Sequence, residues 1–197
     1  MRLNFVEDYL AAVPGGIDGY PECLHRGEPL AQWIEHSPMA GLPERLPAPA
    51  AALLRGDGRV PNWVPEVHAT VIYLAIRELH FRDDAAFLEH ARRCNRAVLQ
   101  TPTNRLLLWA ASPRAILRGT SLRWGSLHRG STLEARTPDE RSAEITLTFP
   151  PRLLPEIILR GNGAGISVAL EGAGAHDVEV DLRTIEPSRA VFHARWH

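Results

Sequence analysis

The sequence contains no lysine, since all 22 of its basic residues are arginine. Without a lysine amine, Schiff-base chemistry, a Walker-type phosphate loop and a lysine general base are excluded. Cysteine is almost as scarce: Cys23 and Cys94 lie far apart, and neither belongs to a C-x-x-C pair. We therefore expect no thiolate zinc site and no redox dithiol, and we interpret both cysteines as buried thiols in a reducing compartment.

Long apolar runs and an excess of charge are also missing. No stretch of about 18 uninterrupted apolar residues is present, so we predict no membrane-spanning segment. Glu7 and Asp8 interrupt the apolar N-terminus, which is untypical of a signal peptide, and we expect a cytoplasmic protein. A net charge of −1 provides no electrostatic basis for binding nucleic acid or an anionic membrane.

Helical spacing of apolar residues dominates the first half of the chain. Proline and glycine interrupt the first sixty residues, so only short helices fit there, at 3–12, 28–36 and 48–55. The stretch "TNRLLLWAA" predicts another short helix, over 103–111. These segments favour a helical subdomain over 1–112.

Two longer helices are expected within that half. Apolar residues recur at helical spacing in 62–81, and Asn62 precedes them as a candidate N-cap. A second amphipathic pattern covers 83–100, where Asp83 and Asp84 are suited to the positive end of a helix. These two helices are expected to form the centre of the helical subdomain.

Alternating polar and apolar residues characterise the second half. Such alternation predicts strands over 121–137, 142–149, 176–184 and 188–196. The whole pattern predicts an α+β fold, in which the helical subdomain packs against an antiparallel sheet with one covering helix in 113–197. We expect the two subdomains to share one core.

A glycine-rich stretch, "EIILRGNGAGISVALEGAGAHDVEVDL", resembles a dinucleotide-binding loop followed by an acidic residue, Asp181. The spacing of Gly161, Gly163 and Gly165 is G-x-G-x-G, however, whereas the dinucleotide motif is G-x-G-x-x-G. Too few residues follow for further βα units. We therefore predict one helical element over 152–170, interrupted or joined by a glycine turn, that covers the sheet, with glycines that permit close packing.

Groups of metal-binding or catalytic residues are incomplete in the sequence. His90 and Cys94 lie one helical turn apart but have no third ligand nearby, and His68 and His80 are more than three turns apart. We therefore predict no metal site. Ser126, two residues before His128, allows a hydrolase hypothesis with Asp177 or Asp181 as the orienting acid. Polar residues on the solvent face of a strand explain the same pattern.

Five tryptophans make a cleft between the two halves plausible. We expect Arg123, Trp124 and His128 on an exposed strand, facing Trp63 and Trp109 from the helices. The candidate ligand-pocket residues are Trp63, His68, Trp109, Arg123, Trp124 and His128.

The order of elements resembles a myxobacterial paralogous family of small proteins of unknown function. The matching segments are "PPRLLPEIILRGNGAGISVALEGAGA", "VEVDLRT" and "VFHARW", with "SPRAILRGTSLRW" upstream and "YPE" near the N-terminus. The resemblance covers about the last ninety residues and implies a bacterial source, in keeping with the arginine-only usage of a GC-rich genome. It implies no activity, cofactor or catalytic residue.

The layout is also similar to that of heme-nitric-oxide/oxygen-binding (H-NOX) sensor domains, in which helices precede an antiparallel sheet. In that family a histidine on a helix shortly before a proline ligates the heme. Here the nearest histidine upstream of Pro113 is His90, and the family's Tyr-x-Ser-x-Arg motif is absent. The resemblance thus implies a shared fold, and we expect no heme or other cofactor.

Three classes of function remain open from the sequence. We favour a non-enzymatic module that binds a small molecule or has a regulatory interaction with a protein partner. The alternatives are an enzyme of specialised metabolism, with histidine and acidic residues as acid–base groups in an apolar cleft, and a structural or assembly protein. Ligand identity and oligomeric state are not encoded in any recognisable motif.

Overall fold

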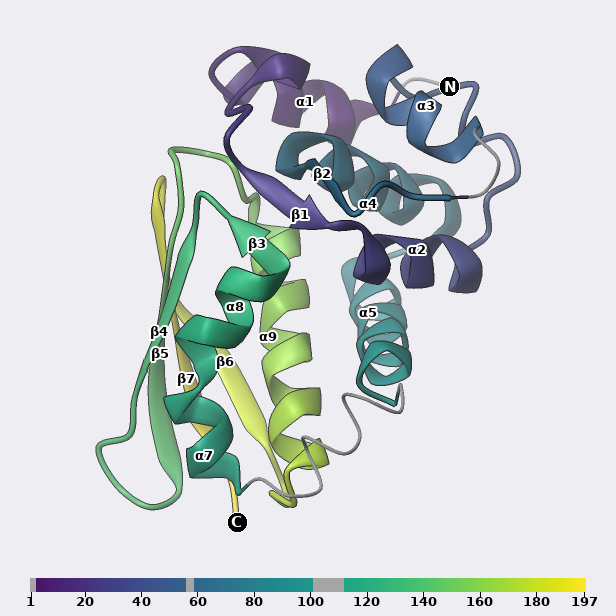
Figure 1. Ribbon diagram of the computed structural model, residues 1–197. Coiled ribbons are helices and arrows are strands. Elements are labelled where there is room, and N and C mark those ends of the chain that lie inside the picture. Colours follow the sequence, from purple (N-terminus) through teal and green to yellow (C-terminus); the bar gives the residue numbers. More distant parts are fainter. Residues whose placement is uncertain (1–2, 56–58, 101–111) are drawn as a thin grey trace.

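The computed structural model describes residues 3–55, 59–100 and 112–197, which form an α+β fold, as predicted (Figure 1). The helices are α1 (Asn4–Ala12), η1 (Gly16–Asp18, a 3-10 turn), α2 (Gly27–His36), α3 (Ala48–Arg55), α4 (Glu66–His80), α5 (Asp84–Leu99), α7 (Pro113–Arg118), α8 (Thr120–Leu127) and α9 (Glu156–Gly172). The strands are β1 (Leu24–Arg26), β2 (Trp63–Pro65), β3 (His128–Arg129), β4 (Thr132–Arg136), β5 (Ser142–Thr148), β6 (Glu179–Glu186) and β7 (Arg189–Arg195).

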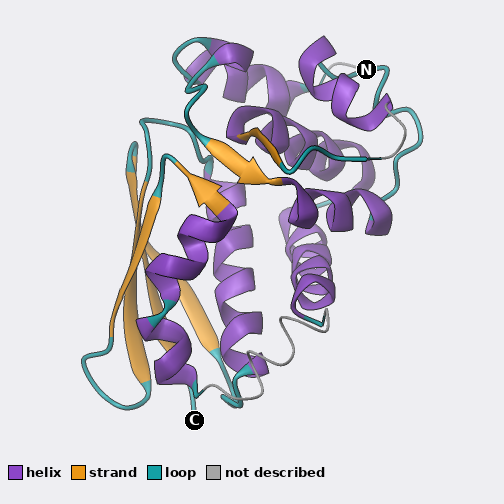
Figure 2. Ribbon diagram, in the orientation of Figure 1, coloured by secondary structure: helices purple, strands orange, loops and turns teal. Residues whose placement is uncertain are grey.

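A four-stranded antiparallel sheet, in the order β4-β5-β7-β6, forms one side of the molecule (Figure 2). Its apolar residues alternate as the sequence predicts, and Ile145 pairs with Phe192 across β5 and β7 on the covered face. Helix α9 packs on this face, and α5 packs along α9 on the side away from the sheet. The core therefore extends from the sheet through α9 into the helical half.

A second, small sheet joins the two halves of the chain. Its order is β2-β1-β3, with all strands antiparallel, so it brings together the segments before α2, before α4 and after α8. Strands of two or three residues have no readable alternation, and the sequence analysis missed them. The prediction of Asn62 as an N-cap was wrong, because Trp63–Pro65 pairs with β1 and Pro65 occupies the N-cap position of α4.

The two long helices predicted in the first half of the chain are present as α4 and α5. Helix α4 is buried along most of its length and forms the centre of the helical half. Asp83 caps α5 as predicted, and its carboxylate accepts a hydrogen bond of 2.8 Å from the backbone N–H of Ala86. Cys23 and Cys94 are both buried with free thiols. The helix predicted over 103–111 lies outside the described residues.

The glycine-rich stretch forms helix α9. It runs without interruption through Gly161, Gly163 and Gly165, and the strands that follow it are antiparallel. A Cβ atom at Gly163 would lie 3.4 Å from the Phe192 ring, so this glycine permits the close approach of helix and sheet. The dinucleotide-loop hypothesis is thereby excluded, and the packing role is confirmed for Gly163.

The strand predicted over 121–137 was wrong in its first part. Residues 120–127 form α8, which begins directly after α7 ends at Arg118. Trp124 and Leu127 are three residues apart and face the interior at helical spacing, whereas Leu122 is 85% exposed. Leu122 and Trp124 are two residues apart, which is the spacing of one face of a strand. In the helix only Trp124 of the two faces the interior, so the alternation did not indicate a strand. Among the described residues, no helix has the length and apolarity needed to cross a bilayer.

We predict that Gly163→Leu lowers the free energy of unfolding by about 1–3 kcal/mol, because the new side chain overpacks against Phe192. Gly161→Ala is the matched control on the same helix, since its Cβ would meet no atom within 4 Å. This control should stabilise the protein by about 0.5–1 kcal/mol. Urea unfolding followed by circular dichroism measures both values, and equal stability of the two variants would contradict the close packing.

His90 provides a test of burial by pH. It is buried, its Nε2 lies 2.8 Å from the Ser37 hydroxyl, and burial lowers its pKa below the usual value. Below about pH 6.5 the unfolded chain therefore binds a proton that the folded chain resists. Stability should fall as the pH drops from 7 to 5. The loss should be smaller in His90→Gln and unchanged in His176→Gln, which alters an exposed residue; identical pH profiles for all three proteins would contradict this.

Candidate functional site

A cavity of about 400 Å³ lies between the helical half and the sheet half. Its walls are contributed by α2, α4, α5, α7, α8 and α9 and by strands of both sheets. The apolar lining residues include Trp33, Phe87, Val98, Leu99, Ile116, Leu117, Trp124, Leu133, Ile145, Ile158, Ile166 and Leu170. Polar lining residues are fewer: His25, Tyr73, Asn95, Thr120, Arg123, Ser126, His128 and Asn162.

A second hollow, of about 560 Å³, lies between α5, α9 and β6. It is more polar, and Arg92 at its wall is already paired with Ser167 and Glu171. Because Arg92 is paired with Glu171 and Arg183 with Asp181, and because the hollow has fewer apolar lining residues, we regard the apolar cavity as the better candidate site.

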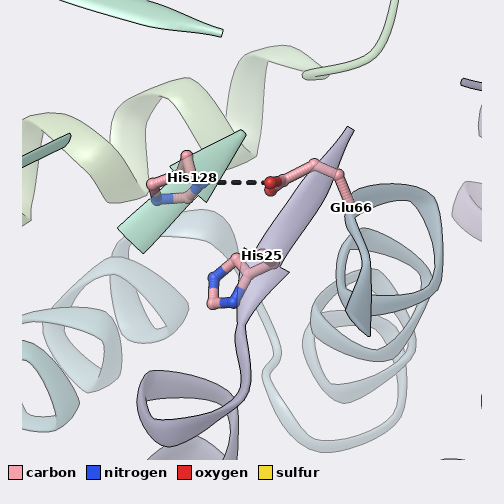
Figure 3. Close-up of side chains that lie close together, drawn as sticks. All are labelled: His25, Glu66 and His128. Carbon is pink, nitrogen blue, oxygen red and sulfur yellow. Dashed lines mark hydrogen bonds and ion pairs between the residues drawn. The ribbon is translucent and has the colours of Figure 1, made fainter. Parts of the chain in front are cut away.

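The small sheet places two histidines at one end of the apolar cavity. In its register His25 of β1 lies directly opposite His128 of β3, so both side chains are on the same face. Glu66 is the first residue of α4, directly after β2, and its backbone N–H donates to the carbonyl of Cys23 at the start of β1. Three segments distant in sequence thus bring two imidazoles and a carboxylate together, as Figure 3 shows.

The three side chains are close and largely shielded from solvent. His128 Nδ1 lies 3.0 Å from Glu66 Oε2, and the rings of His25 and His128 are 4.9 Å apart at 80°. The side chains of Glu66 and His128 are 5% and 11% exposed. One potential ligand atom from each of the three residues lies within 4.8 Å of the others.

The surroundings of His25 fix its tautomer. Its Nδ1 lies 2.6 Å from the Arg26 carbonyl oxygen, to which a ring N–H must donate. Its Nε2 therefore carries the lone pair of the ring, which accepts a hydrogen bond of 3.3 Å from the Tyr73 hydroxyl. Burial lowers the pKa of His25 to about 4, so the ring is neutral near pH 7.

Glu66 is a buried carboxylate that remains ionised. Burial alone would raise its pKa, but the adjacent His128, through its charge and hydrogen bond, and then His25 hold the pKa below the usual value. An isolated buried charge is costly, so this carboxylate depends on the two imidazoles.

Trp124 and Arg123 come from α8, whereas the sequence analysis expected them on a strand with His128. The Trp124 ring stacks on His128 at 3.9 Å, and its Nε1 donates to the Ser131 hydroxyl. Ser126 donates to the Arg123 carbonyl within the same helix, so the expected Ser126–His128 strand arrangement was wrong. All three candidate residues, Arg123, Trp124 and His128, line the cavity.

The other predicted pocket residues lie elsewhere. Trp63 is on β2 and has the guanidinium groups of Arg129 and Arg26 over its ring, at 4.2 and 5.3 Å. His68 lies on α4 next to Ile17, away from the cavity lining, and Trp109 is outside the described residues. His25, Glu66 and Tyr73 also belong to the site, although the sequence does not indicate them. No local motif marks them, because only the pairing of three very short strands brings them together.

Comparison with known proteins gives a fold relationship alone. No family model matches the sequence, and no curated protein matches it. Solved structures of H-NOX domains share the fold. An oxygen-binding H-NOX domain related to soluble guanylate cyclases has a TM-score of 0.58 and 10% identity, covering 87% of this chain and 94% of that chain.

Two further solved structures show the same relationship. The I5F mutant of the H-NOX domain from T. tengcongensis has a TM-score of 0.56 and 12% identity, with 87% of this chain and 97% of that chain covered. The Fe(II) unliganded H-NOX protein from K. algicida has a TM-score of 0.52 and 11% identity, with coverage of 100% and 97%. The sequence-based expectation of an H-NOX-like layout is therefore confirmed.

We predict that Glu66→Ala lowers the free energy of unfolding by about 1–3 kcal/mol, because it leaves the buried His128 ring without its hydrogen-bond partner. Glu179→Ala is the control, since Glu179 is 73% exposed and only loosely paired with Arg195. The control should change stability by no more than about 0.5 kcal/mol. Guanidinium unfolding measures both, and a Glu66→Ala variant as stable as the control would show that the buried pair contributes little.

Proposed function

We propose that this chain is a non-enzymatic binding module that holds one small, largely apolar molecule in the cavity between its two halves. The cavity itself carries the proposal. Its volume of about 400 Å³ falls within the roughly 300–1,000 Å³ of typical ligand sites. A pocket of this size that is lined mainly by apolar side chains with a few polar groups is typical of a small-molecule site.

The distribution of polar groups supports a defined orientation of the ligand. The side chains of α5, α7 and α9 that surround most of the space are apolar except Asn95 and Asn162, while the rings of His25, Tyr73 and His128 are grouped at the end next to the small sheet. An elongated molecule with one polar group would place that group at this end and its apolar body against the helices.

The position of the cavity supports a regulatory role. Helix α5 belongs to the helical half, and α8 and α9 belong to the sheet half, so a ligand between them contacts both. A ligand that fits one relative arrangement of the halves better than another shifts the population toward it. The shared fold with an oxygen-binding H-NOX domain is in keeping with a sensing role.

A heme does not fit the donor groups of this cavity. The sequence has no histidine between His90 and His128, so α7 and α8 offer no axial imidazole. His128 is held by Glu66 and covered by Trp124. His25 Nε2 accepts a hydrogen bond from the Tyr73 hydroxyl, and the Tyr73 and His128 rings lie only 5.8 and 4.9 Å from the His25 ring, which leaves no room for a macrocycle as wide as a porphyrin beside that nitrogen. We therefore propose a ligand other than heme.

An enzyme is the second candidate, and the hydrogen-bonded pair Glu66–His128 at the polar end favours it. A histidine oriented by a carboxylate can act as a general base. Recovery of the bound molecule separates the two candidates, since a binding module returns its ligand chemically unchanged.

A substitution that fills the cavity with a side chain tests whether the ligand binds there. Gly161 lines the cavity, and a Cβ at this position would meet no atom within 4 Å, so Gly161→Phe should fill the space while leaving the fold intact. We predict that a metabolite mixture raises the melting temperature of the wild type and of Gly161→Ala, but not of Gly161→Phe. Mass spectrometry of the retained molecule should show it unchanged.

Gly125→Phe is the matched control, because Gly125 is exposed on α8 and its Cβ would also meet no atom within 4 Å. This variant should bind as the wild type does. Equal binding by Gly161→Phe and the wild type would place the ligand elsewhere. Conversion of the retained molecule to a product would favour the enzyme.

A further inference from the structure

The polar end of the cavity has a donor set that the proposed binding of an apolar molecule does not use. His25, Glu66 and His128 offer two imidazole nitrogens and one carboxylate oxygen within 4.8 Å of one another. Two histidines and one carboxylate are the ligands of catalytic zinc sites and of non-heme Fe(II) sites. The sequence analysis predicted no metal site because these residues share no spacing motif.

We propose that His25, Glu66 and His128 bind one divalent transition-metal ion, of which Zn²⁺ is the representative, with the remaining coordination position open to the cavity. The proposal does not rest on the apolar ligand, because an ion can bind whether or not the cavity is filled.

The distances are close to those that an ion requires. Zinc bonds of about 2.0–2.1 Å in tetrahedral geometry place ligand atoms roughly 3.4 Å apart. The Glu66 oxygen and His128 Nδ1 are already 3.0 Å apart, and the widest separation in the group is within 4.8 Å. Small side-chain rotations therefore bring all three atoms to bonding distance. The ion would take the place of the ring proton that His128 Nδ1 now donates to the carboxylate.

The supporting contacts are those of a metal-binding histidine. The Nδ1 of His25 faces the Arg26 carbonyl oxygen at 2.6 Å, which directs Nε2 toward the site. Histidine ligands commonly donate their second ring N–H to such a carbonyl, which fixes the ring and raises its basicity. Trp124, stacked on His128 and bonded to Ser131, holds the second imidazole in place.

The arginines next to the two histidines in sequence do not oppose a cation here. Arg26 and Arg129 follow His25 and His128 in their strands, so their side chains lie on the other face of the small sheet. There both guanidinium groups lie over the Trp63 ring. The group that faces the open position is the Tyr73 hydroxyl, 3.3 Å from His25 Nε2, which can donate to a metal-bound water or to an oxygen donor of a cavity ligand.

The experiment titrates the chelator-treated full chain with Zn²⁺ by calorimetry, with no other ligand added. We predict one ion per chain and a loss of affinity of at least about tenfold in Glu66→Gln and in His128→Asn. His68→Gln on the same helix α4, outside the group of three, should bind as the wild type does, and so should His90→Gln beside Cys94. Absence of stoichiometric binding, or unchanged affinity in both ligand variants, would overturn the proposal.

A second measurement needs no substitution and so remains decisive if a variant fails to fold. Co²⁺ replaces Zn²⁺ and broadens the NMR signals of protons close to it. The ring signals of His25 and His128 should disappear at one equivalent, while those of His68 and His90 persist. Broadening centred on other histidines would overturn the assignment. If the cavity bound no apolar molecule, the proposed function would fail, but the assignment of the metal site would not be affected.

Discussion

The burial of one carboxylate between two imidazoles is the interaction on which the junction of the two halves depends. Glu66 is ionised although almost fully buried, and a charge in that position is tolerated only with partners. Its partners come from β1 and β3, which reach it because the small sheet pairs three distant segments. The polar group therefore lies at the junction of the helices and the sheets, beside the apolar packing of α5 on α9.

The apolar cavity follows from that junction. The small sheet fixes the helical half at one end of α8 and α9, and α5 packs along α9, so the walls of the cavity belong to both halves. Gly163 brings α9 close to the large sheet, whereas Gly161 leaves open space. The same glycine-rich helix thus packs tightly on one face and borders the cavity on another. A polar end and an apolar body are the features on which the proposed ligand site rests.

Local pattern was sufficient for the large elements and insufficient for the site. Alternation in β5 and β7 and helical spacing in α4 and α5 were readable because each extends over seven or more residues. β1, β2 and β3 are too short to show a periodic pattern of apolar residues. The sequence of α8 alternates like that of a strand because Leu122, although apolar, is exposed. His25 and Glu66 could not be recognised, since their meeting with His128 depends on tertiary pairing. The division at residue 112, the cytoplasmic location and the resemblance to the myxobacterial family stay predictions.

The most direct test of the central claim is anomalous X-ray diffraction at the zinc edge from crystals grown with Zn²⁺. We predict a single strong peak at about 2.0–2.2 Å from one atom each of His25, Glu66 and His128, at the polar end of the cavity. A cavity end with no peak, in which the Glu66–His128 hydrogen bond persists at 3.0 Å, would contradict the claim and leave the three residues with a structural role alone.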